Sequence, residues 1–314
     1  MEESMTKTKS GVYFVDGLIG RPKIVGIVAY LKQYEDDDVE FTRFYTYNHD
    51  TGMWRHTNWN HDIASVSYTR IGPERTWHLL SKRGILVQYS ADGSRELIIP
   101  DADTGPGKLG YVTQIQLIAD QLYVCGFRRQ VYRLDGDIWT HLDEGILAPV
   151  EDLTHGFQSI DGNAPDDLYA VGLQGEMFHY DGRSWQQIDL PTNRDLNRVR
   201  CVRPDLVYAC GDSGVLIRGS GNTWDLIQNS DVTPHFYGVE VFNETVYLSS
   251  LSGLWFLNGD VIASVPTELD PAPKGYRLHT RDGMLWSFGQ DDLVFFDGTK
   301  WERIICPDNA VPCA

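Results

Sequence analysis

Three arginines, Arg70, Arg203 and Arg281, each end a short run that we expect to form a strand. Arginines that converge from several strand ends could bind a carboxylate through paired hydrogen bonds. Hydrolysis of a glycoside would also need two side chains that act as nucleophile and as acid or base. No pair of side chains placed to do that work is recognisable in the sequence. Structural ion pairs at strand ends are therefore the favoured interpretation of these arginines.

Residue types that bind metals are present but scattered. His56 and His61 lie close together without a third near ligand, and the five cysteines form no C-x-x-C pair, so a zinc site is not expected. The acidic stretch 161–167 could hold calcium, although a solvated turn is favoured. There is no Gly-x-Ser-x-Gly motif and no P-loop. The sequence therefore predicts no metal, no cofactor and no catalytic site.

The elements that would position any site come from a repeat. A strand-like segment with a leading aromatic residue and a closing glycine recurs along the chain. The copies are Tyr123-Val124-Cys125-Gly126, Tyr169-Ala170-Val171-Gly172, Tyr208-Ala209-Cys210-Gly211, the weaker Tyr247-Leu248-Ser249-Ser250, and Trp286-Ser287-Phe288-Gly289. Their leading aromatic residues are 46, 39, 39 and 39 residues apart, and Trp77 precedes Tyr123 by another 46. A period near 40 with short strands is typical of a propeller blade.

Most copies continue through a second strand into a tight turn and then a tryptophan. The turns are Asp135-Gly136, Asp181-Gly182, Ser220-Gly221-Asn222 and Asp297-Gly298, followed by Trp139, Trp185, Trp224 and Trp301. Glycine supplies the positive φ that a tight hairpin needs. The tryptophan on the outer strand is expected to cover the apolar strip between neighbouring blades.

The repeat predicts an all-β fold, a β-propeller with seven four-stranded blades. Innermost strands are expected at 65–69, 114–119, 157–161, 199–203, 237–242 and 276–280. Residues 11–60 form a divergent first blade, within a single domain at 11–305. Residues 1–10 are expected to be disordered, and 306–314 to be a C-terminal tail. The alternative is a six-bladed ring with residues 11–57 as a flanking hairpin.

The segment His179-Tyr180-Asp181-Gly182-Arg183-Ser184-Trp185 resembles the Asp-box (BNR-type) and photosystem-assembly-factor-type propeller repeats. The resemblance spans about residues 62–305. Asp boxes carry serine two residues before the aspartate, where this chain has His179 and Phe295, so the copies are partial. Such repeats occur in glycosidases, assembly factors and binding proteins, so the resemblance implies a fold and no single function. Leu18-Ile19-Gly20-Arg21-Pro22 is weakly similar to the Arg-Ile-Pro signature of sialidases but lacks the isoleucine between arginine and proline.

The composition and the net charge of the chain limit the classes of partner that it could bind. The chain has 314 residues, 42% of them hydrophobic, and a formal net charge of −17. A large core is therefore expected, while nucleic acid and anionic membranes would be repelled. Residues 1–10 contain no apolar signal segment and no run is long enough to span a membrane, which favours a cytoplasmic protein unless a leader was removed. Cys306 and Cys313 could form a disulfide or remain free.

Acidic residues dominate the loops that connect each blade to the next. These loops are expected at 58–62, 100–111, 143–156, 191–197, 229–235 and 266–275, with eleven acidic residues against Lys108, Arg194 and Lys274. The loops between second and third strands share this face and add a basic sector at Lys82, Arg83, Arg128 and Arg129. Acidic side chains among aromatic ones suit a protein interface, although they would also simply keep the loops soluble. The predicted partner-binding residues are Asp143, Glu144, Glu151, Asp152, Asp195, Asp231, Phe236, Glu268, Asp270 and Tyr276.

The function favoured by these observations is protein binding without catalysis. The specific hypothesis is an immunity-type inhibitor, acting as a monomer, that covers a basic toxin or enzyme with its acidic loops. A carbohydrate-binding or sialidase-like glycosidase propeller and an assembly scaffold remain as alternatives.

Overall fold

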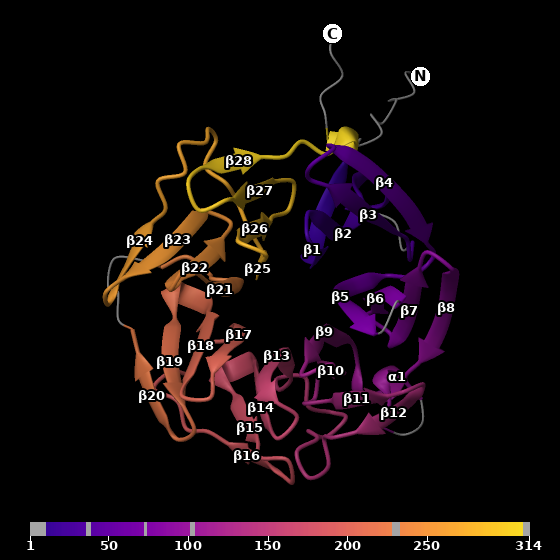
Figure 1. The fold of residues 1–314 in the computed structure, drawn as a ribbon. Coiled ribbons are helices and arrows are strands. Elements are labelled where there is room, and N and C mark those ends of the chain that lie inside the picture. Colours follow the sequence, from indigo (N-terminus) through magenta and orange to yellow (C-terminus); the bar gives the residue numbers. More distant parts are fainter. Residues whose placement is uncertain (1–10, 36–38, 72–73, 101–103, 228–232, 310–314) are drawn as a thin grey trace, which may run out of the picture.

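Seven antiparallel sheets of four strands each are arranged in a ring around a central axis (Figure 1). The computed structural model describes residues 11–35, 39–71, 74–100, 104–227 and 233–309. The predicted all-β fold is confirmed, and so is the seven-bladed ring: residues 12–59 form a complete first blade and not a flanking hairpin.

The blades follow one another along the chain. Blade 1 contains β1 (Val12–Arg21), β2 (Ile24–Leu31), β3 (Thr42–Asn48) and β4 (Met53–Trp59), and blade 2 contains β5 (Ile63–Ile71), β6 (Glu74–Ser81), β7 (Ile85–Ser90) and β8 (Gly93–Ile98). Blade 3 contains β9 (Val112–Ile118), β10 (Gln121–Gly126), β11 (Val131–Asp135) and β12 (Ile138–His141), and blade 4 contains β13 (Phe157–Ala164), β14 (Asp167–Gly172), β15 (Met177–Tyr180) and β16 (Trp185–Gln187). Blade 5 contains β17 (Leu196–Arg203), β18 (Leu206–Gly211), β19 (Leu216–Ser220) and β20 (Thr223–Leu226), and blade 6 contains β21 (Gly238–Phe242), β22 (Thr245–Ser250), β23 (Gly253–Asn258) and β24 (Val261–Ser264). Blade 7 contains β25 (Arg277–Arg281), β26 (Met284–Phe288), β27 (Leu293–Phe296) and β28 (Trp301–Arg303).

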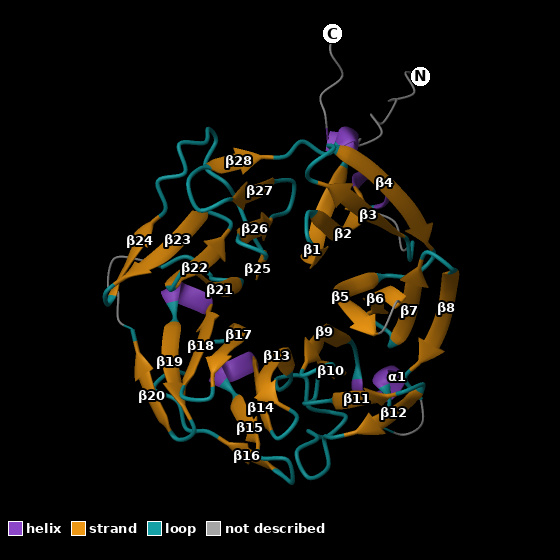
Figure 2. Cartoon of the chain, in the orientation of Figure 1, coloured by secondary structure: helices purple, strands orange, loops and turns teal. Residues whose placement is uncertain are grey.

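Within the described residues, helical structure is confined to the loops between strands and to the end of the last blade (Figure 2). The short elements are α1 (Pro106–Leu109), η1 (Lys32–Tyr34), η2 (Leu173–Gly175), η3 (Asp212–Gly214) and η4 (Pro307–Asn309). Within each blade the first strand is innermost and the fourth is outermost. The repeated aromatic residue therefore lies on the second strand and the repeated tryptophan on the fourth, as the repeat predicts.

The hydrophobic core lies between blades. In the cluster shared by blades 3 and 4, Tyr123 and Phe157 have no exposed surface and Trp185 is 8% exposed. Trp185 reaches across the boundary, because its Nε1 donates a hydrogen bond to the Leu142 carbonyl (2.7 Å), in the loop that joins the two blades. The outer tryptophan therefore both covers the apolar strip and ties one blade to its predecessor.

Polar side chains on the innermost strands also connect neighbouring blades. Asp16 of β1 accepts hydrogen bonds from the Ser65 hydroxyl (2.8 Å) and the Val66 amide (2.9 Å) of β5. Asp161 of β13 accepts one from the Cys201 amide of β17 (2.8 Å). Both carboxylates are buried, so these bonds satisfy groups that would otherwise be costly to bury.

The first and last described residues lie close together, where blade 7 meets blade 1. Asp308 of η4 pairs with Arg43 and accepts a hydrogen bond from the Tyr45 hydroxyl (2.5 Å), while Asn309 accepts one from the Val12 amide (2.8 Å). Residues 306–309 thus pack onto the first blade instead of forming a free tail. Cys306 is a free thiol, 2% exposed, and Cys313 lies outside the described residues.

The Asp308 contacts should contribute to the stability of the closed ring. We expect Asp308→Ala to lower the free energy of unfolding by about 1–3 kcal/mol, because Arg43 and Tyr45 lose a charged acceptor. Burial raises the pKa of Asp308, but the hydrogen bond from Tyr45 and the charge of Arg43 outweigh it, so the pKa lies below the ordinary value. A depressed pKa contributes stability above the pKa of the unfolded carboxyl, and this is lost as pH falls through the folded value.

Urea unfolding of the wild type and of Asp308→Ala at neutral and at acidic pH measures this effect. The difference between the two proteins should be largest at neutral pH and should shrink on acidification. Asp92→Ala, at an exposed turn, is the control and should unfold like the wild type. A difference that grows at low pH would contradict the role assigned to Asp308.

Candidate functional site

The ring has two faces that carry different loops. We call the loop face the one formed by the connections between blades together with the loops between second and third strands. Backbone hydrogen bonds join the two sets: the Lys82 amide donates to the Asp62 carbonyl (2.9 Å) and the Asp212 amide to the Asp195 carbonyl (2.9 Å). The opposite face, which we call the turn face, carries the remaining hairpin turns of each blade, including Asp181-Gly182. The two predicted sets of loops therefore do share one face.

Four of the predicted partner-binding residues are exposed on the loop face. They are Glu144, Glu151, Glu268 and Asp270. No ion pair with another described residue neutralises these four side chains. Asp195 and Tyr276 are half-buried, and the Asp195 carboxylate is engaged by the Gln174 amide (2.7 Å). The four exposed acids are thus the ones free to meet a partner.

Two predicted contact residues are unsuitable because they are buried. Asp143 is 2% exposed and accepts a hydrogen bond from the Val131 amide (3.0 Å), and burial raises the pKa of its carboxyl. Phe236 has no exposed surface and belongs to the core between blades 5 and 6. Both side chains therefore belong to the packed interior. Asp231 lies outside the described residues.

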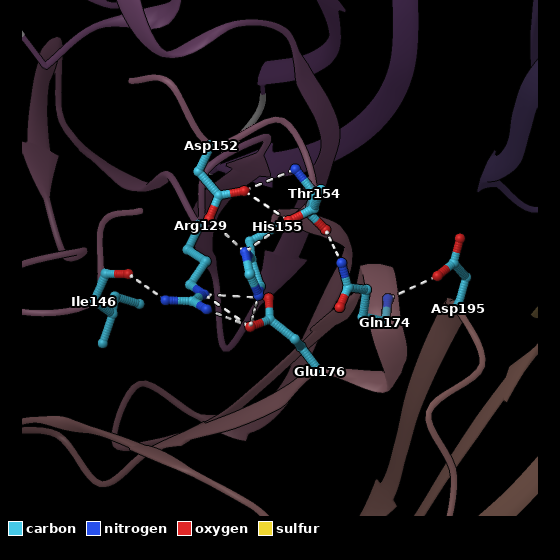
Figure 3. Close-up of polar contacts among 8 residues, drawn as sticks. All are labelled: Arg129, Ile146, Asp152, Thr154, His155, Gln174, Glu176 and Asp195. Atoms are coloured by element: carbon cyan, nitrogen blue, oxygen red, sulfur yellow. Dashed lines mark hydrogen bonds and ion pairs between the residues drawn. The ribbon is translucent and has the colours of Figure 1, made fainter. Parts of the chain in front are cut away.

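Asp152 has a structural role at the centre of the loop between blades 3 and 4 (Figure 3). Its carboxylate accepts hydrogen bonds from the Thr154 amide and hydroxyl (2.8 Å each) and lies 2.5 Å from His155 Nδ1. The hydrogen bonds from Thr154 hold the pKa of Asp152 well below its ordinary value. His155 is in turn 3.7 Å from Glu176, a nearly buried carboxylate that pairs with Arg129. The network fixes the shape of the 143–156 loop.

The predicted basic sector is largely neutralised. Arg129 is held by Glu176, and Arg128 is 8% exposed. Lys82 pairs with Asp62 (2.7 Å) and Arg83 with Glu40 (2.8 Å). The unpaired charge that the described loop face presents therefore comes mainly from the exposed acids.

Exposed apolar side chains lie beside these acids and were not among the predicted contacts. Leu153 is 74% exposed, Val150 51% and Tyr111 50%. The Tyr111 carbonyl accepts the Phe127 amide (2.9 Å), and Phe127 pairs with Gly156 at the end of the 143–156 loop, so the two loops meet. Exposed apolar residues flanked by charge are typical of protein interfaces. Val150 and Leu153, apolar residues within an acidic loop, were the signal in the sequence.

At the centre of the ring, the loop face contains a cavity of about 460 Å³ lined by residues from all seven blades. Tyr237 and Tyr276 lie on its rim with ring centroids 5.2 Å apart. Deeper in the cavity, Arg277 is 7% exposed and its Nε is 3.5 Å from Asp16. The predicted contact Tyr276 thus borders an opening and not a flat surface.

The three arginines considered first are not equivalent. Arg203 pairs with Asp205 on the turn face (2.7 Å), as the ion-pair interpretation predicts. Arg70 and Arg281 instead line one hollow on the turn face. Within the described part of the chain, no group of three His, Cys, Asp or Glu side chains is arranged to hold a metal ion. No described helix is long and apolar enough to cross a membrane.

Comparisons with known proteins place this geometry in context. No family model matches the chain. Solved structures of similar fold include YCF48 bound to D1 peptide (TM-score 0.66, 13% identity, 96% of this chain and 95% of that one) and the WD40 propeller domain of Doa1 (TM-score 0.65, 9% identity, 93% and 95%). YCF48 from Cyanidioschyzon merolae gives a TM-score of 0.67 at 12% identity over 94% of this chain and 96% of that one. These likenesses confirm the propeller and do not confirm the Asp-box type of repeat.

A relative of known class is much closer in sequence. The immune protein Tsi7 of Pseudomonas aeruginosa strain PAO1 is 31% identical over 294 residues, which cover 90% of this chain and 96% of that protein. An immunity protein works by binding another protein and is not an enzyme. The chain is accordingly an immunity-type, protein-binding β-propeller that belongs to the family of the immune protein Tsi7.

Proposed function

We propose that the chain neutralises a basic toxin by binding it with the loop face, one propeller to one toxin. The observation that carries this proposal is the surface of the 143–156 loop, where Glu144 and Glu151 accompany the exposed side chains of Val150 and Leu153. Exposed carboxylates speed the approach of a cationic partner. Apolar side chains that lose water on contact supply most of the binding energy.

The scaffold beneath this surface favours tight binding. Asp152, His155 and Glu176 already hold the loop in one conformation through the contacts described above. A loop ordered in advance loses little conformational entropy when it binds. The partner class follows from the charge: an acidic toxin would be repelled by Glu144, Glu151 and Glu268, whereas a basic one would be attracted.

We expect a gene for the toxin to lie beside the gene for this chain, and protection of cells against that toxin tests the proposal. Co-production of the wild-type chain should restore growth of a host that makes the toxin. Leu153→Asp should abolish or strongly reduce protection, because a charge then replaces an exposed apolar contact. Ile138→Asp is the matched control, since Ile138 is also exposed (71%) but begins an outer strand next to the turn face.

The proposed docking site is wrong if the two variants protect equally well while the wild type protects. Protein levels in the host must be equal for the comparison. Failure of the wild-type chain to protect against the adjacent toxin would contradict the proposed function itself.

A further inference from the structure

A hollow of about 330 Å³ on the turn face lies where blades 1, 2 and 7 meet, and four arginines line it. Arg21 ends β1, Arg70 and Arg75 face each other across β5 and β6, and Arg281 ends β25. Blades 1 and 2 are consecutive and blade 7 comes last in the chain, so closure of the ring places Arg281 in the same hollow as the other three arginines. The sequence singled out three of these residues, Arg21, Arg70 and Arg281, without showing that they converge.

Little negative charge balances these arginines. Asp50 is the one carboxylate among the described residues that line the hollow, and it is already paired with Lys23 (2.8 Å). The side chains of Arg21, Arg70 and Arg75 are exposed, and no hydrogen bond or ion pair joins these side chains to another described residue. Arg281 donates to the Gly20 carbonyl (2.9 Å) and is 3.8 Å from Asp282.

The four arginines repel one another electrostatically when no ligand is bound. Arg70 and Arg75 are directly opposite in the antiparallel register, and like charges in that position destabilise a sheet. Four cations close together in a chain of net charge −17 are not explained by ordinary surface pairing. Arg203, which ends the innermost strand of blade 5, shows the ordinary solution, a partner carboxylate two residues away.

The hollow continues into a groove of about 470 Å³ between blades 1 and 2. Arg21, Arg75 and Tyr68 border both spaces. The groove then runs past aromatic side chains, with Arg55 and His56 at its exposed edge. Its aromatic lining consists of Phe44, Tyr47, Tyr68, Trp77 and Tyr89. A cationic end and a partly apolar body are thus continuous in one concave site, of the size that small ligands occupy.

We propose that this site binds a small phosphate ester, with the phosphate among Arg21, Arg70, Arg75 and Arg281 and the organic body in the adjoining groove. A phosphate monoester carries up to two negative charges and several acceptor oxygens, which can be shared among guanidinium groups. A carboxylate has one charge and two oxygens, and so satisfies fewer of the four arginines. The site is on the face opposite the proposed toxin contact and does not depend on it.

Calorimetric titration with phenyl phosphate, inorganic phosphate and benzoate tests the proposal. The wild type should bind phenyl phosphate saturably, more tightly than inorganic phosphate, which has no body for the groove, and more tightly than benzoate, which has no phosphate. The double variant Arg70→Gln, Arg75→Gln should weaken phenyl phosphate binding by at least about tenfold, because two charged donors are lost. It should still unfold cooperatively, since both side chains are exposed and unpaired.

The matched control is the double variant Arg203→Gln, Arg218→Gln, which removes the same charge from residues paired with Asp205 and Asp260. It should bind phenyl phosphate within about twofold of the wild type, because screened charges at a distance contribute little.

Absence of saturable binding by the wild type, or an equal loss in both double variants, would overturn the site. Tighter binding of a polyglutamate peptide than of phenyl phosphate would also overturn it, in favour of an acidic protein segment. Toxin protection should be unchanged in Arg70→Gln, Arg75→Gln.

Discussion

Reversal of Glu144, Glu151 and Glu268 to lysine should slow association with the proposed basic toxin about 100-fold at low salt, since steering by complementary charge spans about that range. All three carboxylates are exposed on the loop face, and no described residue forms an ion pair with them. The dissociation rate should change less, because exposed charges at an interface act mainly on the encounter. Stopped-flow binding at several salt concentrations measures both rates, and the wild-type association rate should itself fall as salt rises.

The control reverses the same number of charges on the other side of the molecule. Asp92, Asp166 and Asp225 are exposed and lie in or near the turns, so their reversal changes net charge equally. Asp152 is left intact in both variants, because its carboxylate holds the Thr154 amide and its loss would disturb the loop. If both triple variants bind equally slowly, net charge alone decides the rate and the loop face has no special part in it.

Trp185→Ala should lower the free energy of unfolding by about 3–5 kcal/mol, the usual cost of removing a large buried ring. Trp185 is 8% exposed, packs against Tyr180 and Phe157 at centroid distances of 5.2 and 6.2 Å, and loses its bond to Leu142 on truncation. Chemical denaturation measures the loss, with the exposed Ile138→Ala as a control expected to change stability by less than about 0.5 kcal/mol.

Truncation of Trp301 tests whether the loss of stability depends on the burial of the tryptophan or only on its position in the repeat. It occupies the same place in blade 7 but is only half-buried, stacked on Phe296 at 4.9 Å. We therefore expect Trp301→Ala to cost about 1–3 kcal/mol, less than Trp185→Ala. Equal losses at the two positions, or a Trp185→Ala protein as stable as the wild type, would refute the role of the outer tryptophan as a clamp between blades.

The propeller fold could be predicted because the motif that specifies each blade is short and recurs along the chain. Tyr123, Tyr169 and Tyr208 recur with the same closing glycine, and a period near 40 leaves few other folds. The first blade was harder to predict, since it lacks the full motif of the other blades. Its place in the ring depends on contacts with the other end of the chain, such as those of Asp308 and Asn309.

The functional surface was predictable only in part, because residues distant in sequence decide whether a loop side chain is exposed, buried or paired. Arg129 is neutralised by Glu176, which is 47 positions away. Asp143 and Phe236 are as polar or as aromatic as their neighbours in sequence, yet they are buried. The composition of the loops predicted that their net charge is negative. Which of their acidic side chains are exposed follows only from the packed structure. Arg21 and Arg281 converge for the same reason, through closure of the ring.

Hydrogen–deuterium exchange of the chain with and without its toxin tests the central claim most directly. Binding should slow exchange in the loops 143–156 and 266–275 and around Tyr111, while the turns near Asp181, Asp205 and Asp297 should exchange as in the free protein. Protection confined to those turns, with the loop face unchanged, would show that the toxin docks on the opposite side of the ring and would contradict the account.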